Sequence, residues 1–238
     1  MKNYSSRKGF TLAEVLITLA IVGIIAVLTI PTLISNYKKK QTVAKLKQTY
    51  SVLSQAISMA QVNRGDMSTY DLGYFYKVSS KDSSFSREEY LTNFFLNYIK
   101  PYVKVAKDYG YKIGTVDFDY VRSHADYYFK LQSGALVAIT FSTGCYNYLP
   151  EGVCDSQGSY YNSLIFWVDL NGFDPPNYQG KDIFLMEVLP STGRFRFYIT
   201  NTNVQRASLL NSCKTSKVSC GYLIMYDGWA IKDDYPWL

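Results

Sequence analysis

The amino-acid sequence predicts an α+β fold in which one long N-terminal helix packs on an antiparallel β-sheet. Three observations lead to this prediction. Residues 15–37 form an uncharged apolar run of the length that a membrane-spanning helix needs. Apolar side chains then continue at helical spacing as far as residue 60, and beyond residue 126 they alternate with polar ones, as in half-buried strands. A helix laid on a sheet buries both apolar surfaces in two layers.

Charges are distributed unevenly over the 238 residues, whose formal net charge is +6. The first 62 residues hold eight basic residues and one acidic residue, whereas the remainder is almost neutral. The charge therefore predicts no nucleic-acid-binding surface on the larger part of the chain. The single histidine, His124, excludes a multi-histidine metal centre, and a serine–histidine–aspartate triad would have to use it. The sequence contains no phosphate-loop, nucleophile-elbow or zinc-protease motif, so we expect no enzyme and assign no catalytic residue.

The first predicted element is one helix over about residues 10–62, in two parts. The first part, residues 10–37, is the transmembrane or assembly helix, because its uncharged run would rise roughly 35 Å through a hydrocarbon core of about 30 Å. The second part, residues 38–62, is an amphipathic continuation, and no helix breaker precedes Asn63-Arg64-Gly65. Its apolar positions are three or four residues apart: Val43, Leu46, Tyr50, Leu53, Ile57 and Ala60.

Glu14 is an acidic side chain at the start of the apolar helix. A carboxylate inside a membrane costs a few kcal/mol, so we expect it to have a partner. Cleavage of the chain after the small residue Gly9 would leave a new amino group on Phe10, four residues before Glu14 and on the same helix face. Packing two subunits side by side would then neutralise both charges. The alternative is a Glu14 that lies among the lipid headgroups and is solvated.

The sequence Arg7-Lys8-Gly9-Phe10-Thr11-Leu12-Ala13-Glu14, followed by an apolar helix, resembles the class III signal of type IV pilins and type II secretion pseudopilins. The resemblance implies that a prepilin peptidase removes a leader of residues 1–9, by cleavage between Gly9 and Phe10, and methylates the new amino group of Phe10. It also implies that Glu14 is the assembly carboxylate. Ala13 departs mildly from the family, because a bulkier aliphatic residue is more usual at this position.

Pro31 lies inside the predicted helix, where the family commonly has a proline. A proline in a helix interior costs about 3 kcal/mol in water. A membrane helix tolerates it when neighbouring groups satisfy the carbonyl that has lost its donor. We expect Pro31 to permit a kink or local melting when the subunit leaves the bilayer for a filament. A kink without functional consequence is the alternative.

The resemblance implies a non-enzymatic structural subunit of a type IV pilus or a type II secretion filament. Its expected partners are other pilin or pseudopilin subunits, prepilin peptidase, the inner-membrane assembly platform and membrane lipid. We expect a single-pass protein of the inner membrane with its head outside the cytoplasm, and later a periplasmic or cell-surface filament. Basic residues flanking the span favour the opposite orientation, but a large C-terminal domain can be exported despite them. The alternatives are a minor tip pilin whose head binds a surface, carbohydrate or DNA, and an exported enzyme that the helix anchors.

Residues 63–238 are expected to form the globular head. Ser86-Arg87-Glu88-Glu89 is a capping-box pattern that opens a helix as far as Pro101. Ser133-Gly134 and Pro190-Ser191-Thr192-Gly193 are turn sequences, and each lies between segments in which apolar and polar residues alternate. Each therefore predicts a β-hairpin. For the C-terminal sequence Asp233–Trp237, docking on an edge strand and contact with a partner are both open alternatives. The predicted strands are residues 127–132, 135–142, 164–170, 183–189, 194–200, 222–226 and 229–231.

The four cysteines form two local pairs in the sequence, Cys145 with Cys154 and Cys213 with Cys220. An even number of cysteines in an exported domain predicts two disulfides, and we favour local pairing among the three possible connectivities. A zinc site with four thiolates is the alternative, but it needs shorter spacings. Reduced core cysteines would be expected only if the head lay in the cytoplasm.

Oxygen-bearing side chains gather in one turn-rich segment, at Asp169, Asn171, Asp174 and Asp182. Calcium prefers such clusters, and some pseudopilins carry a calcium loop in the head. The spacing does not match an EF-hand loop, and turn formation by aspartate and asparagine side chains explains the same residues. We expect no other cofactor.

Overall fold

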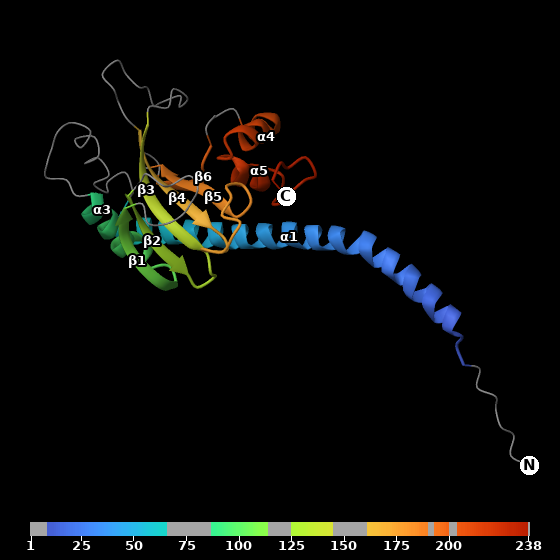
Figure 1. Cartoon of the computed structure of the whole chain (residues 1–238). Helices are drawn as coiled ribbons and strands as arrows, with labels where there is room; N and C mark the ends of the chain where they lie inside the picture. The colour runs from blue at the N-terminus through green and yellow to red at the C-terminus, as the bar shows by residue number, and fades with distance from the viewer. Residues whose placement is uncertain are drawn as a thin grey trace, which may run out of the picture.

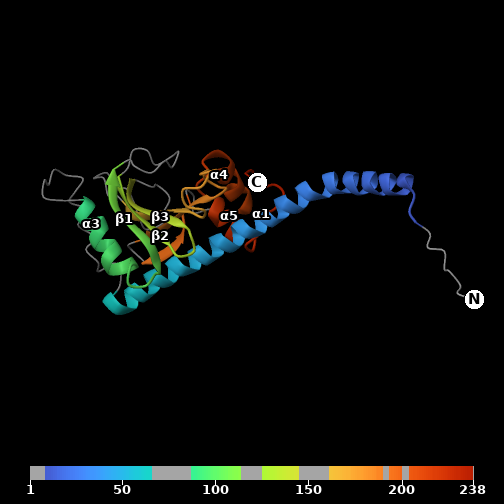
Figure 2. The same ribbon diagram turned by 60° about the horizontal axis from the view of Figure 1, so that its bottom comes forward.

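In the computed structural model, the described residues are 9–65, 87–113, 125–144, 161–189, 193–199 and 204–237. Helix α1 (Leu12–Arg64) crosses one face of a six-stranded antiparallel sheet and extends far beyond the head toward the N-terminus (Figures 1 and 2). The predicted α+β fold is therefore confirmed. The sheet and the short helices pack along one side of the C-terminal half of α1, whereas its N-terminal half projects away from the head (Figure 2).

Helix α1 contains 53 residues without interruption. It ends at the predicted stop, because Gly65 adopts a φ of 94° that favours glycine, and its amide donates to the Gln61 carbonyl at 2.9 Å. Two of the predicted apolar positions, Val43 and Tyr50, are only half-buried and pack on the edge of the core. The fully buried positions of the helix confirm the rest of the stripe and add two residues: Leu46, Thr49, Leu53, Ala56, Ile57 and Ala60.

The sheet is a meander in which every strand pairs with the next strand along the chain. The predicted hairpin around Ser133-Gly134 is confirmed, with Phe129 opposite Val137. Gly134 has a φ of 92°, and the Leu131 amide donates to the Ala135 carbonyl at 2.8 Å, which closes the turn. The strands are β1 (Val105–Ile113), β2 (Ala125–Leu131), β3 (Leu136–Gly144), β4 (Tyr161–Asp169), β5 (Ile183–Leu189) and β6 (Arg194–Phe197).

The main core lies between one face of the sheet and the helices. Helix α3 (Arg87–Phe94) continues into a single π-helical turn, η3 (Phe95–Ile99), as the capping-box sequence predicted, although Ser86 itself lies outside the described residues. The Phe95 ring stacks on Tyr127 with 4.5 Å between centroids. The end of α1 is tied to the same turn, because the Arg64 guanidinium donates to the Asn97 side chain at 3.3 Å.

The last two predicted strands are wrong, because residues 222–226 lie in helix α5 (Cys220–Tyr226) and residues 229–231 lie in no strand. This apolar run has no polar alternation, so its periodicity does not distinguish a strand from a buried helix. Asp227-Gly228 ends α5, and Trp229 follows with a φ of 61°. Helix α4 (Arg206–Thr215), which was not predicted, precedes α5.

Strand β1 was also not predicted. Its register with β2 shifts between Val105 and Lys107 and again between Asp108 and Gly110. The two irregularities break the alternation that a sequence pattern would need. Strand β6 ends at Phe197, earlier than predicted, whereas β4 begins three residues before the predicted segment.

Candidate assembly helix and its junction with the head

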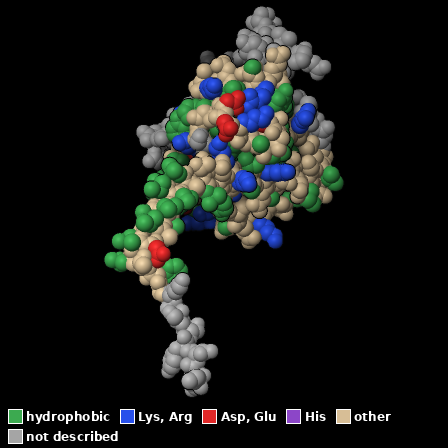
Figure 3. Space-filling view, turned by 90° about the vertical axis from the view of Figure 1, so that its right-hand side faces the viewer, with side chains coloured by type: hydrophobic (Ala, Val, Ile, Leu, Met, Phe, Trp, Pro, Cys, Tyr) green, Lys and Arg blue, Asp and Glu red, His purple; other side chains and the backbone are tan. Residues whose placement is uncertain are grey.

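The N-terminal half of α1 is uncovered in a single subunit. Among the described residues, α1 is the one helix that is long and apolar enough to cross a membrane, and none of its apolar window is buried. Leu28 and Leu33, for example, are 71% and 70% exposed. Apolar side chains line this part of the helix in the space-filling view (Figure 3). Because apolar surface in water costs about 25 cal/mol per Å², lipid or neighbouring helices have to cover it.

Thr11 and Glu14 form a capping box at the start of α1. The Thr11 amide donates to Glu14 Oε2 at 2.8 Å, and the Thr11 hydroxyl donates to the same oxygen at 2.9 Å. The Glu14 amide donates in turn to Thr11 Oγ1 at 3.3 Å. The carboxylate therefore points back to the N-terminus of the helix, one residue from Phe10, whose nitrogen is an amide in the uncleaved chain. Gly9 and Phe10 precede the helix, and Phe10 is 90% exposed.

Pro31 lies inside α1 without interrupting it. Its ring nitrogen carries no hydrogen, so the Val27 carbonyl receives no amide donor from position 31. The Thr29 hydroxyl donates to the Ile25 carbonyl at 2.9 Å, a contact that often bends helices. The N-terminal half of α1 curves away from the line of the C-terminal half (Figures 1 and 2). Helix melting at Pro31 stays a prediction.

The head contacts α1 immediately after the apolar run. Lys39 Nζ lies 3.3 Å from Asp233 Oδ1 in the C-terminal tail, which is defined here as residues 227–237. Two turns later, Lys47 lies over the Trp229 ring at 5.6 Å from its centroid. Tyr50 stacks on Phe197 with 4.7 Å between centroids, and burial raises the pKa of its hydroxyl. The C-terminal tail therefore bridges α1 and the sheet.

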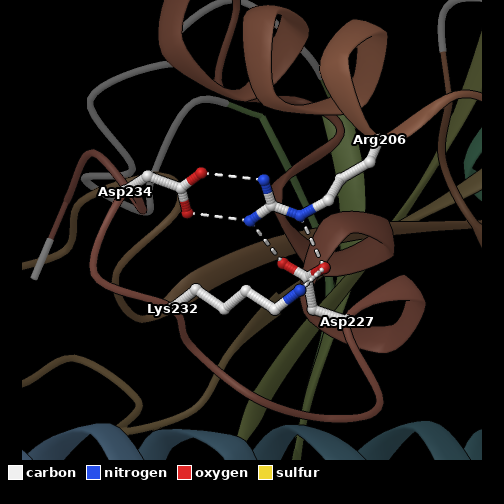
Figure 4. A network of polar contacts seen from close by, with 4 residues as sticks. All are labelled: Arg206, Asp227, Lys232 and Asp234. Carbon is white, nitrogen blue, oxygen red and sulfur yellow. Dashed lines mark hydrogen bonds and ion pairs between the residues drawn. The ribbon is translucent and has the colours of Figure 1, made fainter.

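Arg206 holds the C-terminal tail to α4 and α5 (Figure 4). Its guanidinium makes a bidentate pair with Asp227 at 2.7 and 2.9 Å, and a second bidentate pair with Asp234, both contacts at 2.8 Å. Lys232 Nζ also lies 2.8 Å from Asp227. Burial raises the pKa of Asp227, but the hydrogen bonds from Arg206 and Lys232 outweigh it and lower the pKa overall. Both carboxylates are therefore charged and paired at neutral pH.

Cys213 and Cys220 form a disulfide that joins α4 to the start of α5, as local pairing predicted. The end of the tail packs on it, because the Trp237 indole donates to the Cys213 carbonyl at 3.0 Å. A side chain at Gly180 would place its Cβ 2.7 Å from the Trp237 ring, so this position requires glycine. Tyr235 and Trp237 of the C-terminal tail thus dock on the β4–β5 loop and α4, whereas Trp229 of the same tail lies against Phe197 of the edge strand β6. Cys145 and Cys154 lie outside the described residues.

The predicted oxygen cluster builds the β4–β5 loop. Asp169 is 1% exposed and accepts from the Asn171 amide at 3.0 Å, and burial raises its pKa to about 7. Asp182 accepts from the amides of Asn177 and Tyr178 at 2.9 and 2.6 Å. Asn171 donates its side-chain amide to the Asp174 carbonyl at 2.7 Å.

These contacts are the ones expected when aspartate and asparagine side chains stabilise a turn. The Asp174 side chain is exposed. No group of three His, Cys, Asp or Glu side chains suited to a metal occurs among the described residues. Calcium binding at the loop stays an untested alternative to the turn interpretation.

Comparison with known families gives two matches that together span most of the chain. The model of the prokaryotic N-terminal methylation motif matches residues 4–30, a segment that includes Gly9, Phe10 and Glu14. This motif is the prepilin-type signal of type IV pilins and pseudopilins. The model of a family of unknown function, DUF6613, matches residues 32–238. No curated protein and no solved structure matches the chain.

Proposed function

Because the chain belongs to the family of unknown function DUF6613 and carries a prepilin-type signal, we propose that it is a structural subunit of a type IV pilus or type II secretion filament. The observation that carries the proposal is the uncovered apolar half of α1 directly behind that signal. A pilin-type signal implies assembly with other pilin subunits. Their helices would cover in the filament the surface that lipid covers before assembly.

Processing precedes assembly in this proposal. Prepilin peptidase cleaves between Gly9 and Phe10 and methylates the new amino group of Phe10. The position of this bond supports the proposal, because it lies before the N-cap Thr11 and outside the helix. Phe10 is exposed, so a membrane protease can reach the bond without first unwinding α1.

Assembly then uses the charge of Glu14. The carboxylate already accepts two hydrogen bonds from Thr11 of its own chain, both at Oε2. A carboxylate oxygen accepts more than one bond, so the group has capacity for the methylated amino group of a neighbouring Phe10. Pairing the two charges removes the cost, a few kcal/mol, of a lone carboxylate in an apolar helix bundle. The inner-membrane assembly platform, driven by a cytoplasmic ATPase, would lift each subunit into the filament.

The proposed location is the inner membrane, with a single span and the head outside the cytoplasm. The disulfide between Cys213 and Cys220 supports this orientation, because disulfides persist in oxidising compartments and are rare in the cytosol. After assembly the head would belong to a periplasmic or cell-surface filament.

Two measurements in the native cells test the proposal. Mass analysis of the extracted protein should find a chain that begins at Phe10 and carries one methyl group on its amino terminus. A chain that still begins at Met1 would overturn the proposal. Glu14→Ala should be cleaved normally but fail to enter sheared filaments. Normal incorporation of this variant would refute the charge pairing.

The matched control is Glu14→Asp, which keeps the charge on a shorter side chain. It should recover part of the assembly that Glu14→Ala loses. Equal loss in both variants would assign the defect to side-chain length rather than to charge.

A further inference from the structure

We propose that the head binds anionic phospholipid headgroups through the face next to the apolar half of α1. This membrane-proximal face is defined by Lys38, Lys40, Lys214, Lys217, Lys232 and Trp237. Figure 3 looks onto this side of the head, and Lys and Arg side chains gather there around a small acidic group. The inference rests on the proposed function, because it requires that α1 spans the bilayer.

The head has no linker that would separate it from the bilayer. The uncharged run ends at Tyr37, and Lys39, two residues later, already contacts Asp233 of the C-terminal tail at 3.3 Å. Two residues correspond to about 3 Å along a helix axis. The headgroup layer on each side of a bilayer is roughly 5–8 Å thick. The C-terminal tail therefore lies at the depth of the headgroups whenever the apolar run occupies the hydrocarbon core.

Packing farther along α1 keeps the head in this position. Leu46 and Leu53 are fully buried against the sheet, and the Tyr50 ring stacks on Phe197. Lifting the head away from the membrane would expose these side chains to water. The contact between the C-terminal tail and the headgroups is therefore built into the fold.

The charge of the membrane-proximal face fits an anionic partner. Asp227 and Asp234 are both held by Arg206, and Asp227 is held by Lys232 as well, so their charges are compensated. Lys38, Lys40 and Lys214 are exposed. Basic residues near an anionic membrane surface attract it with about 1 kcal/mol each, over roughly a Debye length.

Aromatic side chains on the same face fit the interface between headgroups and water. The Lys217 ammonium lies 3.9 Å from the Tyr178 ring centroid and 5.2 Å from that of Trp237. Both rings are half-buried. Tyrosine, tryptophan and lysine together are typical of protein surfaces at the headgroup level.

Tryptophan quenching in vesicles tests the proposal with the full chain. Trp229 and Trp237 lie in the C-terminal tail, whereas Trp167 is 6% exposed in the sheet and gives a constant background. The chain is reconstituted in phosphatidylcholine vesicles that contain a small fraction of nitroxide-labelled lipid, either phosphatidylglycerol or phosphatidylcholine. At equal fraction, we expect the labelled phosphatidylglycerol to quench about two-fold more strongly.

This ratio should fall toward one when NaCl rises from 0.1 M to 1 M, because the Debye length shortens from about 10 Å to about 3 Å. The triple variant Lys38→Gln/Lys40→Gln/Lys214→Gln should also lose at least half of the excess quenching.

The matched control removes the same charge from the other end of the head. Lys104, Lys107 and Lys112 are exposed on or beside β1, away from the C-terminal tail (Figure 1). Their triple replacement by Gln should leave the ratio unchanged. Equal quenching by the two labelled lipids, or an equal loss in this control, would overturn the inference. Flotation of the same vesicles separates the proposals, because a chain that does not float refutes the membrane span itself.

Discussion

Leu53 and Leu33 offer a comparison of the two halves of α1 within one helix. Leu53 is fully buried against the sheet, whereas Leu33 is 70% exposed in the apolar half. Replacement by Ala removes the same atoms at both positions and changes helix propensity little. Leu53→Ala should lower the free energy of unfolding of the head, and Leu33→Ala should not.

The magnitude follows from the burial of Leu53. Removing a fully buried leucine side chain loses about 2 kcal/mol of transfer free energy, and the cavity that remains adds about 1 kcal/mol or more. A loss of about 3 kcal/mol in a head of this size corresponds to a melting temperature roughly 6–12 °C lower. Leu33 loses no buried contact within its own subunit, so its variant should melt within about 1 °C of the parent chain.

The assay is thermal unfolding of the full chain in a mild detergent, followed by near-ultraviolet circular dichroism of the head aromatics. Detergent covers the apolar half in every sample, so the comparison reports the head. Equal melting temperatures for Leu53→Ala and the parent chain would refute the packing of α1 on the sheet. A loss of the same size in Leu33→Ala would refute the division of the helix into two functional halves.

Three further outcomes are expected. The double variant Cys213→Ala/Cys220→Ala should lower the free energy of unfolding of the head by about 2.5 kcal/mol, because the disulfide restricts the entropy of the unfolded chain over a loop of this length. An unchanged melting temperature would argue against the disulfide. The pKa of Asp169 is raised to about 7 by burial, so its charged form opposes folding. Stability should fall as pH rises from 5 to 8, and Asp169→Asn should remove that fall; a parallel pH profile would contradict this. Because Asp182 already accepts from two backbone amides, neither calcium nor a chelator should shift the melting temperature, and a calcium-dependent increase would instead establish the metal site.

Local sequence patterns predicted the parts of the fold that local contacts determine. Helix α3 begins at Arg87, within the predicted capping-box sequence, and the Ser133-Gly134 turn closes between adjacent strands. Both therefore appear in the sequence as short motifs. The spacing of apolar residues in α1 likewise predicted its buried stripe, since helix geometry alone fixes which positions share a face.

Contacts between distant segments could not be predicted in this way. Arg206 meets Asp227 and Asp234 from 21 and 28 residues away, and no spacing rule relates them. The same holds for the Tyr50 ring and Phe197, which tertiary packing brings together. The strand assignment for residues 222–226 failed because a wholly apolar segment carries no periodicity, and the disulfide and C-terminal tail then decide its conformation.

In the proposed filament, the unbroken course of α1 would fix the rotational orientation of the head about the filament axis. Each residue of an α-helix turns the chain by about 100° and advances it by about 1.5 Å. One residue inserted between Tyr37 and Lys39 would rotate the whole sheet by about a quarter-turn. The rotation is relative to the face of the apolar half of α1 that would contact neighbouring helices. Seven inserted residues would nearly restore the phase while raising the head by about 10 Å. The number of helical residues between the apolar run and the first contact with the head would thus determine which side of each head faces the neighbouring subunits.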